Sequence, residues 1–213
     1  VYFHAKTLKG QLKRQAFWLL KQYAGMESYG NKNLAASFYD SIVRLFGINY
    51  EEREHIEKKY GIQYSEEWQD SGLMKLSNLE LDCKLREYFI AHQKEDESEG
   101  YYRISPHDLI EAQTHIRTGI QLENKVVKNR MFNTFHTVRE GLIFYSTISF
   151  EQDLNAMPSS LLGDLACIVY SFRRIGAGIH RGRGEIKARL LIGDDEIPYS
   201  KFVNAGGYES VLL

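Results

Sequence analysis

RRIGAGIHRGRGEIKARL, from Arg173 to Leu190, is a stretch rich in glycine and arginine that connects two predicted elements of the fold. It contains four glycines and five arginines, with one histidine, one lysine and one glutamate. Apolar periodicity predicts a helix before it, over residues 157–176, and a strand after it, over residues 185–193. A flexible and cationic segment therefore separates two elements that are expected to contribute to the core.

This segment has two interpretations. In the first, it is a tight link in which glycines supply positive φ angles and arginines maintain solubility. In the second, backbone N–H groups without a nearby Cβ approach phosphate oxygens, and arginines add bidentate hydrogen bonds. The spacing is not that of a P-loop, which requires Gly-Lys-Ser/Thr, nor of a dinucleotide-binding loop, which follows a strand and precedes a helix.

The composition is that of an ordinary globular protein. The chain has 213 residues, of which 43% are hydrophobic and 26% charged. We expect one domain over residues 1–213, with a helical and acidic insertion over about residues 48–70. No apolar run has the length of a membrane span and nothing resembles a signal peptide, so a cytoplasmic protein without a membrane partner is expected. Cys83 and Cys167 are expected to be reduced and to fill core space.

The spacing of apolar residues predicts helices combined with a mostly antiparallel sheet. The first helix is expected within residues 5–25, with Thr7 as its N-cap and Gly25 just past its end. Its buried face is expected to consist of Leu8, Leu12, Leu19, Leu20 and Tyr23. Further helices are expected over residues 33–47 and 50–61, and strands over residues 72–83, 114–123 and 141–150. This order of elements is typical of the α+β class.

Charge is distributed unevenly, although the formal net charge is only −1. Residues 1–24 carry five Lys/Arg and no acid, and residues 171–190 carry six Lys/Arg against Glu185 alone. Residues 51–99, by contrast, carry fourteen Asp/Glu against seven Lys/Arg. A polyanion requires a local basic surface and not a basic average, so the pattern permits nucleic-acid binding without requiring it.

Three segments of the chain, in the same order along the sequence as in the family, resemble the RAMP superfamily of CRISPR-associated proteins. The first one considered is the helix, glycine–arginine loop and strand around residues 173–190. The second, YFHAKTLKGQLKR at residues 2–14, is similar to the family's Ile-Pro-Gly-Ser-Ser-Leu-Lys-Gly-x-x-Arg segment, and the third covers residues 115–150. Positions that match or are replaced conservatively are Thr7, Leu8, Lys9, Gly10 and Lys13 in the second segment, and Arg117, Thr118, Ile120, Leu122 and Glu123 in the third. His4, Ala5 and Lys6 depart from the family pattern, and Asn124 replaces a usual basic residue.

The resemblance implies a backbone subunit of a type III effector complex, with a ferredoxin-like, RRM-like core whose first strand would precede Val1. Such a subunit holds the backbone of CRISPR guide RNA, presents it to target RNA, and contacts other subunits of the complex. A β-hairpin thumb is implied over about residues 123–139. The residues implied to contact RNA are Lys6, Thr7, Lys9, Lys13, Arg117, Lys128, Arg130, Phe132, Gly176, Gly178, His180, Arg181, Gly182, Arg183 and Gly184.

No catalytic residue, metal or cofactor is expected in this chain. Some family members cleave target RNA with an aspartate in a loop that would precede Val1, and neither HExxH nor CxxC spacing occurs. The alternative is a metal-independent RAMP endoribonuclease that processes the guide precursor, with His4 or His136 as general acid or base. A protein-binding scaffold that uses the acidic insertion, residues 51–70, is a third reading and is compatible with RNA binding.

Overall fold

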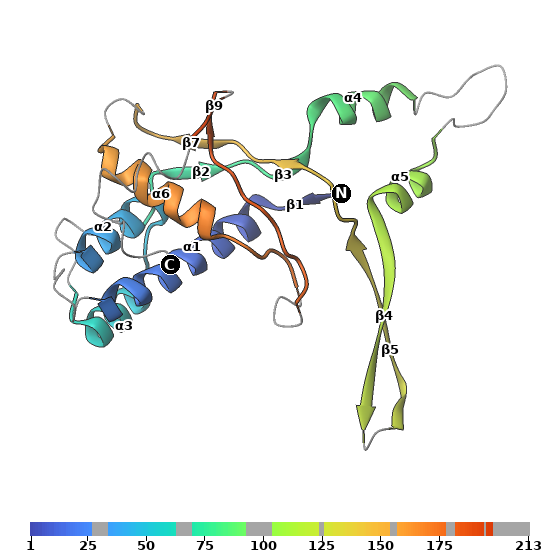
Figure 1. Ribbon diagram of the computed structural model, residues 1–213, viewed down its shortest axis with the longest axis horizontal. Coiled ribbons are helices and arrows are strands. Elements are labelled where there is room, and N and C mark those ends of the chain that lie inside the picture. Colours follow the sequence, from blue (N-terminus) through green and yellow to red (C-terminus); the bar gives the residue numbers. More distant parts are fainter. Residues whose placement is uncertain are drawn as a thin grey trace. The chain divides into compact units, whose positions relative to one another are not determined.

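The computed structural model describes residues 1–26, 34–62, 70–92, 104–123, 126–153, 157–177, 182–193 and 195–197. Within these ranges the fold is mixed α+β, and every strand pair is antiparallel, as predicted (Figure 1). The chain forms two compact units. One, here called the hairpin unit, comprises Val1–Phe3 and Asn78–Ser146, and the other, the helical unit, comprises His4–Ser77 and Thr147–Leu213. The expectation of a single domain over residues 1–213 stays a prediction.

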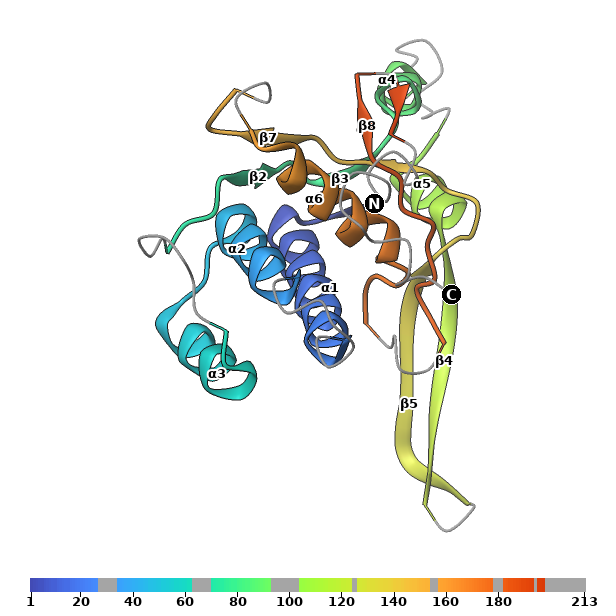
Figure 2. The ribbon, with the colours of Figure 1, turned by 60° about the vertical axis from the view of Figure 1, so that its left-hand side comes forward.

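The helical unit is organised around three helices that pack together, α1 (Ala5–Met26), α2 (Leu34–Phe46) and α6 (Ser159–Ser171) (Figure 2). The strands β2 (Met74–Leu76) and β7 (Ile148–Phe150) pair beside them. The fully buried side chains that fill this unit include Leu20, Phe38, Ile42, Leu165 and Ile168. The predicted face of α1 is confirmed, because Leu8, Leu12, Leu19, Leu20 and Tyr23 are all buried.

The start of α1 differs from the prediction that Thr7 is its N-cap. The helix begins at Ala5, and Thr7 lies exposed in its first turn. His4 takes the capping position, since its ring Nδ1 accepts the Lys6 N–H at 3.1 Å and its carbonyl accepts the Thr7 N–H at 2.9 Å. A histidine can cap in this way through a ring nitrogen that carries no proton. Sequence preferences favoured threonine because such caps are usually Ser, Thr, Asp or Asn.

Capping interactions define both ends of the charged helix α3 (Tyr50–Tyr60). Asn49 and Glu52 form a reciprocal capping box at its start, and Gly61 ends it in the left-handed region at φ 69°. Ile56 is its only buried side chain, in agreement with a largely solvated helix. A salt bridge of 2.6 Å from Lys13 to Glu52 links it to α1.

One polar contact lies inside the apolar core of the helical unit. The Ser41 hydroxyl of α2 donates a hydrogen bond of 2.5 Å to the Asp164 carboxylate of α6. Asp164 is only 1% exposed and Ser41 is also buried. Removing a carboxylate from water is costly unless hydrogen bonds replace the lost hydration, so this bond stabilises the packing of α2 on α6.

The strand predicted over residues 185–193 is wrong for most of its length. The backbone is extended, with Glu185, Lys187 and Arg189 exposed and Leu190 buried, but only Leu191–Ile192 forms a strand, β8. Its partner is the short strand β9 (Asp195–Glu196). Alternation of apolar and polar residues reports which side of an extended segment is buried, whereas a strand also needs a neighbouring strand. Among the described residues no strand pairs with the segment between Ile186 and Leu190.

The hairpin unit contains a three-stranded sheet and a separate two-stranded ribbon. The sheet consists of β1 (Tyr2–Phe3), β3 (Leu79–Leu81) and β6 (Phe144–Tyr145). Two helices, α4 (Cys83–His92) and α5 (Pro106–Gln113), lie in the chain between β3 and the ribbon. The ribbon is formed by β4 (Thr114–Glu123) and β5 (Val126–Val138). The strand predicted over residues 114–123 is therefore confirmed, whereas α4 and α5 were not predicted.

The hairpin differs from the thumb expected over residues 123–139. That segment is one arm of a hairpin whose other arm is β4, so the hairpin begins at Thr114 and ends at Val138 (Figure 1). The register shifts between Ile120 and Leu122. The resemblance implied a thumb separate from the strand over residues 114–123, but the pairing of β5 with β4 makes the two segments a single hairpin.

The composition indicated no membrane span and two buried cysteines. No helix among the described residues is long and apolar enough to cross a membrane. Cys167 is buried in α6, as expected for a core residue. Cys83 is exposed at the first position of α4, so the prediction that it fills core space is wrong.

The buried pair of Ser41 and Asp164 gives a prediction about stability. Ser41→Ala removes a donor from a buried carboxylate and should lower the free energy of unfolding by about 1–3 kcal/mol. Ser37→Ala, on the exposed side of the same helix, should change it by less than about 0.5 kcal/mol. Urea unfolding of both variants measures the difference, and equal midpoints would show that the bond contributes nothing.

Candidate nucleic-acid interface

The glycine–arginine loop is closed at its base by an antiparallel pair of backbone segments. The Ile175 N–H donates to the Gly184 carbonyl and the Ile186 N–H donates to the Arg173 carbonyl, both at 2.9 Å. Arg174 and Glu185 face each other in the same antiparallel bridge. We call this base, residues 173–175 and 184–186, the neck. It holds both ends of the loop at fixed positions immediately after α6.

Glycine is required at the neck itself. Gly184 has φ +70°, and a Cβ added there would lie 2.0 Å from the Ile175 carbonyl oxygen. No side chain fits at that distance, so glycine is what permits the close approach of the two segments. Gly176 and Gly182 also have positive φ angles, of 95° and 70°, but a Cβ at either would meet nothing. The expectation that glycines supply positive φ in this loop is thus confirmed at three positions.

The loop itself is described only in part. Gly178, His180 and Arg181 lie outside the described residues. At the neck, Arg173 and Arg174 are exposed, and Arg183 is half-buried. The exposed arginines that the structure describes here, Arg173 and Arg174, therefore lie in the neck, next to the loop.

The predicted residues at the start of α1 divide into two groups. Lys6 and Thr7 are exposed. Lys9 and Lys13 instead contact other elements: the Lys9 ammonium donates to the Met74 carbonyl of β2 at 2.8 Å, and Lys13 pairs with Glu52. Burial, with a smaller contribution from the charge of Lys13, lowers the pKa of Lys9.

The two faces of the β4–β5 hairpin carry different side chains. Residues opposite each other in the register share a face, so Arg117 and Phe135 lie on one face, with His115 two residues before Arg117. The Arg117 guanidinium donates to the His115 ring at 2.8 Å. His136 lies opposite Ile116 on the other face, where its Nδ1 is 3.3 Å from the Thr114 hydroxyl.

The remaining predicted residues of the hairpin are described only in their backbone. Lys128, Arg130 and Phe132 belong to β5, and Phe132 lies opposite Ile120 in the register. Their side chains lie outside the described part of the structure. Their contact with RNA stays a prediction.

Arg139 secures the base of the hairpin, a role that the sequence did not indicate. Its Nε donates to the carbonyls of Glu111 at 3.0 Å and Thr114 at 3.2 Å, and its backbone N–H donates to the Gln113 carbonyl at 2.9 Å. A cation at the last carbonyls of a helix satisfies acceptors that have no partner within the helix and complements its dipole. At the other end of α5, the Ser105 hydroxyl and N–H hold the pKa of Asp108 below its usual value.

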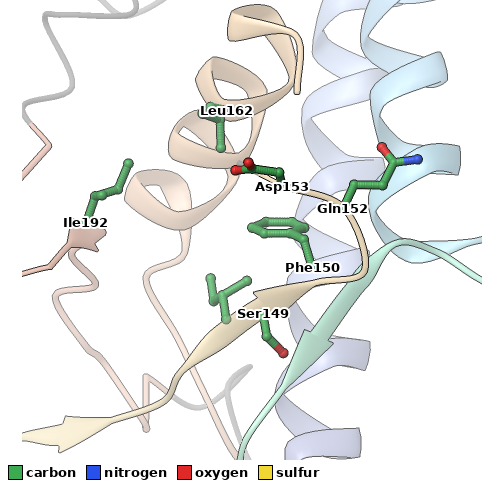
Figure 3. Close-up of a pocket in the computed structure, with 7 residues that line it drawn as sticks. Ser149, Phe150, Gln152, Asp153, Leu162 and Ile192 are labelled. Carbon is green, nitrogen blue, oxygen red and sulfur yellow. The ribbon is translucent and has the colours of Figure 1, made fainter. Parts of the chain in front are cut away.

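A shallow cavity of about 450 Å³ lies in the helical unit between β7, α6 and β8 (Figure 3). It is lined by Ile148, Ser149, Phe150, Gln152, Asp153, Leu162 and Ile192. None of these side chains is cationic, so the cavity does not have the character of a phosphate site. Among the described residues, no three His, Cys, Asp or Glu side chains are grouped so that they could hold a metal ion.

Comparisons with known proteins do not assign the chain to a family. No protein-family model matches the sequence, and no curated protein matches it.

The neck leads to a prediction about single glycines. Gly184→Ala should break the neck, because its methyl group cannot fit against the Ile175 carbonyl, and the amides of Ile175 and Ile186 should exchange with solvent much faster. Gly182→Ala provides a matched control with the same φ of 70° and open space around the Cβ. It should cost about 1 kcal/mol of backbone strain and leave the two amides protected. Equal exchange in both variants would exclude the steric explanation.

The Arg139 contacts lead to a second prediction, for the hairpin. Arg139→Met should increase exchange at Thr114, whose N–H bonds to Ile110, and at the amide of residue 139 by about fivefold, the equivalent of about 1 kcal/mol. Arg117→Met removes an exposed guanidinium from the same hairpin and should leave both amides unchanged. If Arg139→Met also leaves them unchanged, Arg139 does not secure the hairpin.

Proposed function

We propose that this protein binds RNA as a subunit of a CRISPR type III effector complex, holding the guide RNA backbone for pairing with target RNA. The observation that supports this best is the glycine–arginine loop on its hydrogen-bonded neck. A hydrogen-bonded base also occurs in a tight link between two elements. In a phosphate-binding loop it has a further effect, because backbone donors that are already held in place lose less conformational entropy when the ligand binds.

The chemistry of the loop fits a phosphodiester backbone. Glycines let N–H groups approach phosphate oxygens closely, and arginines provide planar pairs of donors that match them. Such contacts carry no base preference, which suits a protein that must hold guides of any sequence. The proposed contacts in the loop are Gly176, Gly178, His180, Arg181, Gly182, Arg183 and Gly184.

Gly10 in α1 supports the same proposal. It occupies an exposed position inside a helix, where glycine costs about 1 kcal/mol relative to alanine. A Cβ at Gly10 would meet nothing within the chain, so internal packing does not account for this glycine. An RNA backbone lying close to the helix does account for it, with Lys6 and Thr7 as exposed polar contacts one turn earlier.

The finer features of the family belong to this proposal as well. They are a ferredoxin-like RAMP core, a cytoplasmic location, and contacts with other subunits of the effector complex. The mixed α+β fold with antiparallel strand pairs is compatible with such a core. The β4–β5 hairpin is the element proposed as the thumb, with Arg117, Lys128, Arg130 and Phe132 toward RNA.

The alternative, a guide-processing endoribonuclease with His4 or His136 as general acid or base, is not proposed, because no specific contact favours it. The Nδ1 of His4 accepts a backbone hydrogen bond at the start of α1, and the Nδ1 of His136 lies 3.3 Å from the Thr114 hydroxyl.

Charge reversal in the loop tests the proposed function. Arg181→Glu with Arg183→Glu should weaken binding of single-stranded RNA for all sequences alike, because phosphate contacts are lost. The slope of log affinity against log salt should fall by roughly 0.7 for each lost contact. Fluorescence anisotropy of labelled oligonucleotides measures both quantities.

The matched control is Lys58→Glu with Lys59→Glu, which reverses two exposed cations at the end of α3. It changes the net charge by the same amount and should leave affinity and slope near those of the unmodified protein. RNA binding that resists the loop substitutions, or that falls equally in the control, would refute the proposal.

A further inference from the structure

The solvent-facing side of α1 carries a row of residues that continues beyond the family-like segment at residues 2–14. Residues three or four positions apart along a helix share a face. The exposed members of this row are Thr7, Gly10, Arg14, Trp18, Lys21 and Gly25. They lie opposite the buried positions Leu8, Leu12, Ala16, Leu19 and Tyr23. We call the segment Arg14–Trp18–Lys21 of this row the α1 stripe.

The stripe is cationic and has no acid on its own helix. Residues 1–24 contain no Asp or Glu. Within the described residues neither Arg14 nor Lys21 forms an ion pair, in contrast to Lys13, whose partner is Glu52 on α3. One flank of the stripe is formed by half-buried amide side chains, Gln11, Gln15 and Gln22. Arg14 and Lys21 are both exposed, so an external anion can reach them.

Trp18 is the exposed aromatic side chain of this row. It is 52% exposed, although a tryptophan side chain gains more than most from burial. Phe17 beside it is half-buried and lies 5.7 Å below the Lys13 ammonium. An exposed aromatic ring between two cations on one helix face combines the two contacts that single-stranded nucleic acids use, base stacking and phosphate pairing.

The composition of the stripe distinguishes between two kinds of partner. A protein partner that docks by apolar burial needs several large apolar side chains on the surface, and Trp18 is the only exposed one among the described side chains of α1. An acidic protein would pair with Arg14 and Lys21, but it would offer the Trp18 ring no specific contact. Single-stranded RNA satisfies both, since every base has a face that can stack on an aromatic ring.

We propose that the α1 stripe is a second RNA-contact surface, on which a base stacks on Trp18 while Arg14 and Lys21 pair with phosphates on either side. Arg14 and Lys21 lie about two turns apart, roughly 10 Å along the helix axis. This inference rests on the proposed RNA-binding function and adds to it residues outside the glycine–arginine loop and the first turn of α1. Base stacking and phosphate pairing carry no base preference, so the stripe is expected to bind RNA of any sequence.

Tryptophan fluorescence tests the stacking directly. The chain contains two tryptophans, Trp18 and Trp68, so the Trp68→Phe protein reports on Trp18 alone. Titration with an oligouridylate of about twelve nucleotides should quench its emission, and added salt should reverse the quenching. Polyglutamate of the same charge should leave the emission unchanged. Equal quenching by polyglutamate would overturn the proposal in favour of an acidic protein partner.

Variants separate the ring from the charges. Trp18→Ala should weaken oligouridylate binding by at least about fivefold and Trp18→Phe should restore part of the loss, because a smaller aromatic ring still stacks. Tyr50→Ala removes another aromatic ring, 67% exposed on α3, and should change nothing. Arg14→Gln with Lys21→Gln should lower the salt slope by about 1.4, whereas Lys58→Gln with Lys59→Gln should leave it unchanged.

The outcomes distinguish this inference from the function on which it rests. If oligouridylate binds and the loop substitutions weaken it, but Trp18 emission and the stripe variants show no effect, the stripe is overturned and the RNA-binding function stands. If oligouridylate does not bind the unmodified protein, both are overturned.

Discussion

The hydrogen bond from the Ser41 hydroxyl to the Asp164 carboxylate constrains how α2 and α6 pack in the core of the helical unit. Apolar side chains on α2 and α6 would tolerate small shifts of one helix along the other, whereas a directional bond between two buried groups fixes their register. The C-terminal end of α6 leads within two residues to the neck of the glycine–arginine loop. The position of a cationic loop at the surface is thereby linked to a contact made deep in the core.

Helix α1 shows how one element can combine an internal and an external role. Two half-buried lysines have internal partners: Lys9 donates to the Met74 carbonyl of β2, and Lys13 pairs with Glu52 of α3. Burial lowers the pKa of Lys9. Two other cations of the same helix, Arg14 and Lys21, are exposed. Sequence alone placed all of these charges in one basic segment. Only the three-dimensional position of each side chain separates those that stabilise the fold from those available to a ligand.

Features that depend on local interactions were predicted correctly from the sequence, whereas features that depend on distant neighbours were not. The buried face of α1 and the strand over residues 114–123 were predicted correctly, because periodicity reflects local geometry. The strand over residues 185–193 was predicted wrongly, since pairing depends on a neighbour that the local sequence does not specify. The cap at His4 and the guanidinium of Arg139 escaped prediction for related reasons: one is an uncommon capping residue, and the other acts on a helix far from it in sequence.

The hairpin unit is held together in a different way from the helical unit. Among its described side chains only two polar ones, Gln113 and Thr114, are buried, and none of the apolar ones is. A two-stranded ribbon without a packed face is marginally stable in water, so the order of β4 and β5 depends on hydrogen bonds at its base. Those bonds come from Arg139 and the end of α5. An element that is ordered chiefly by contacts at one end has a low free energy of local opening, and a ligand bound along its length would stabilise it far more than it would stabilise the apolar core of the helical unit.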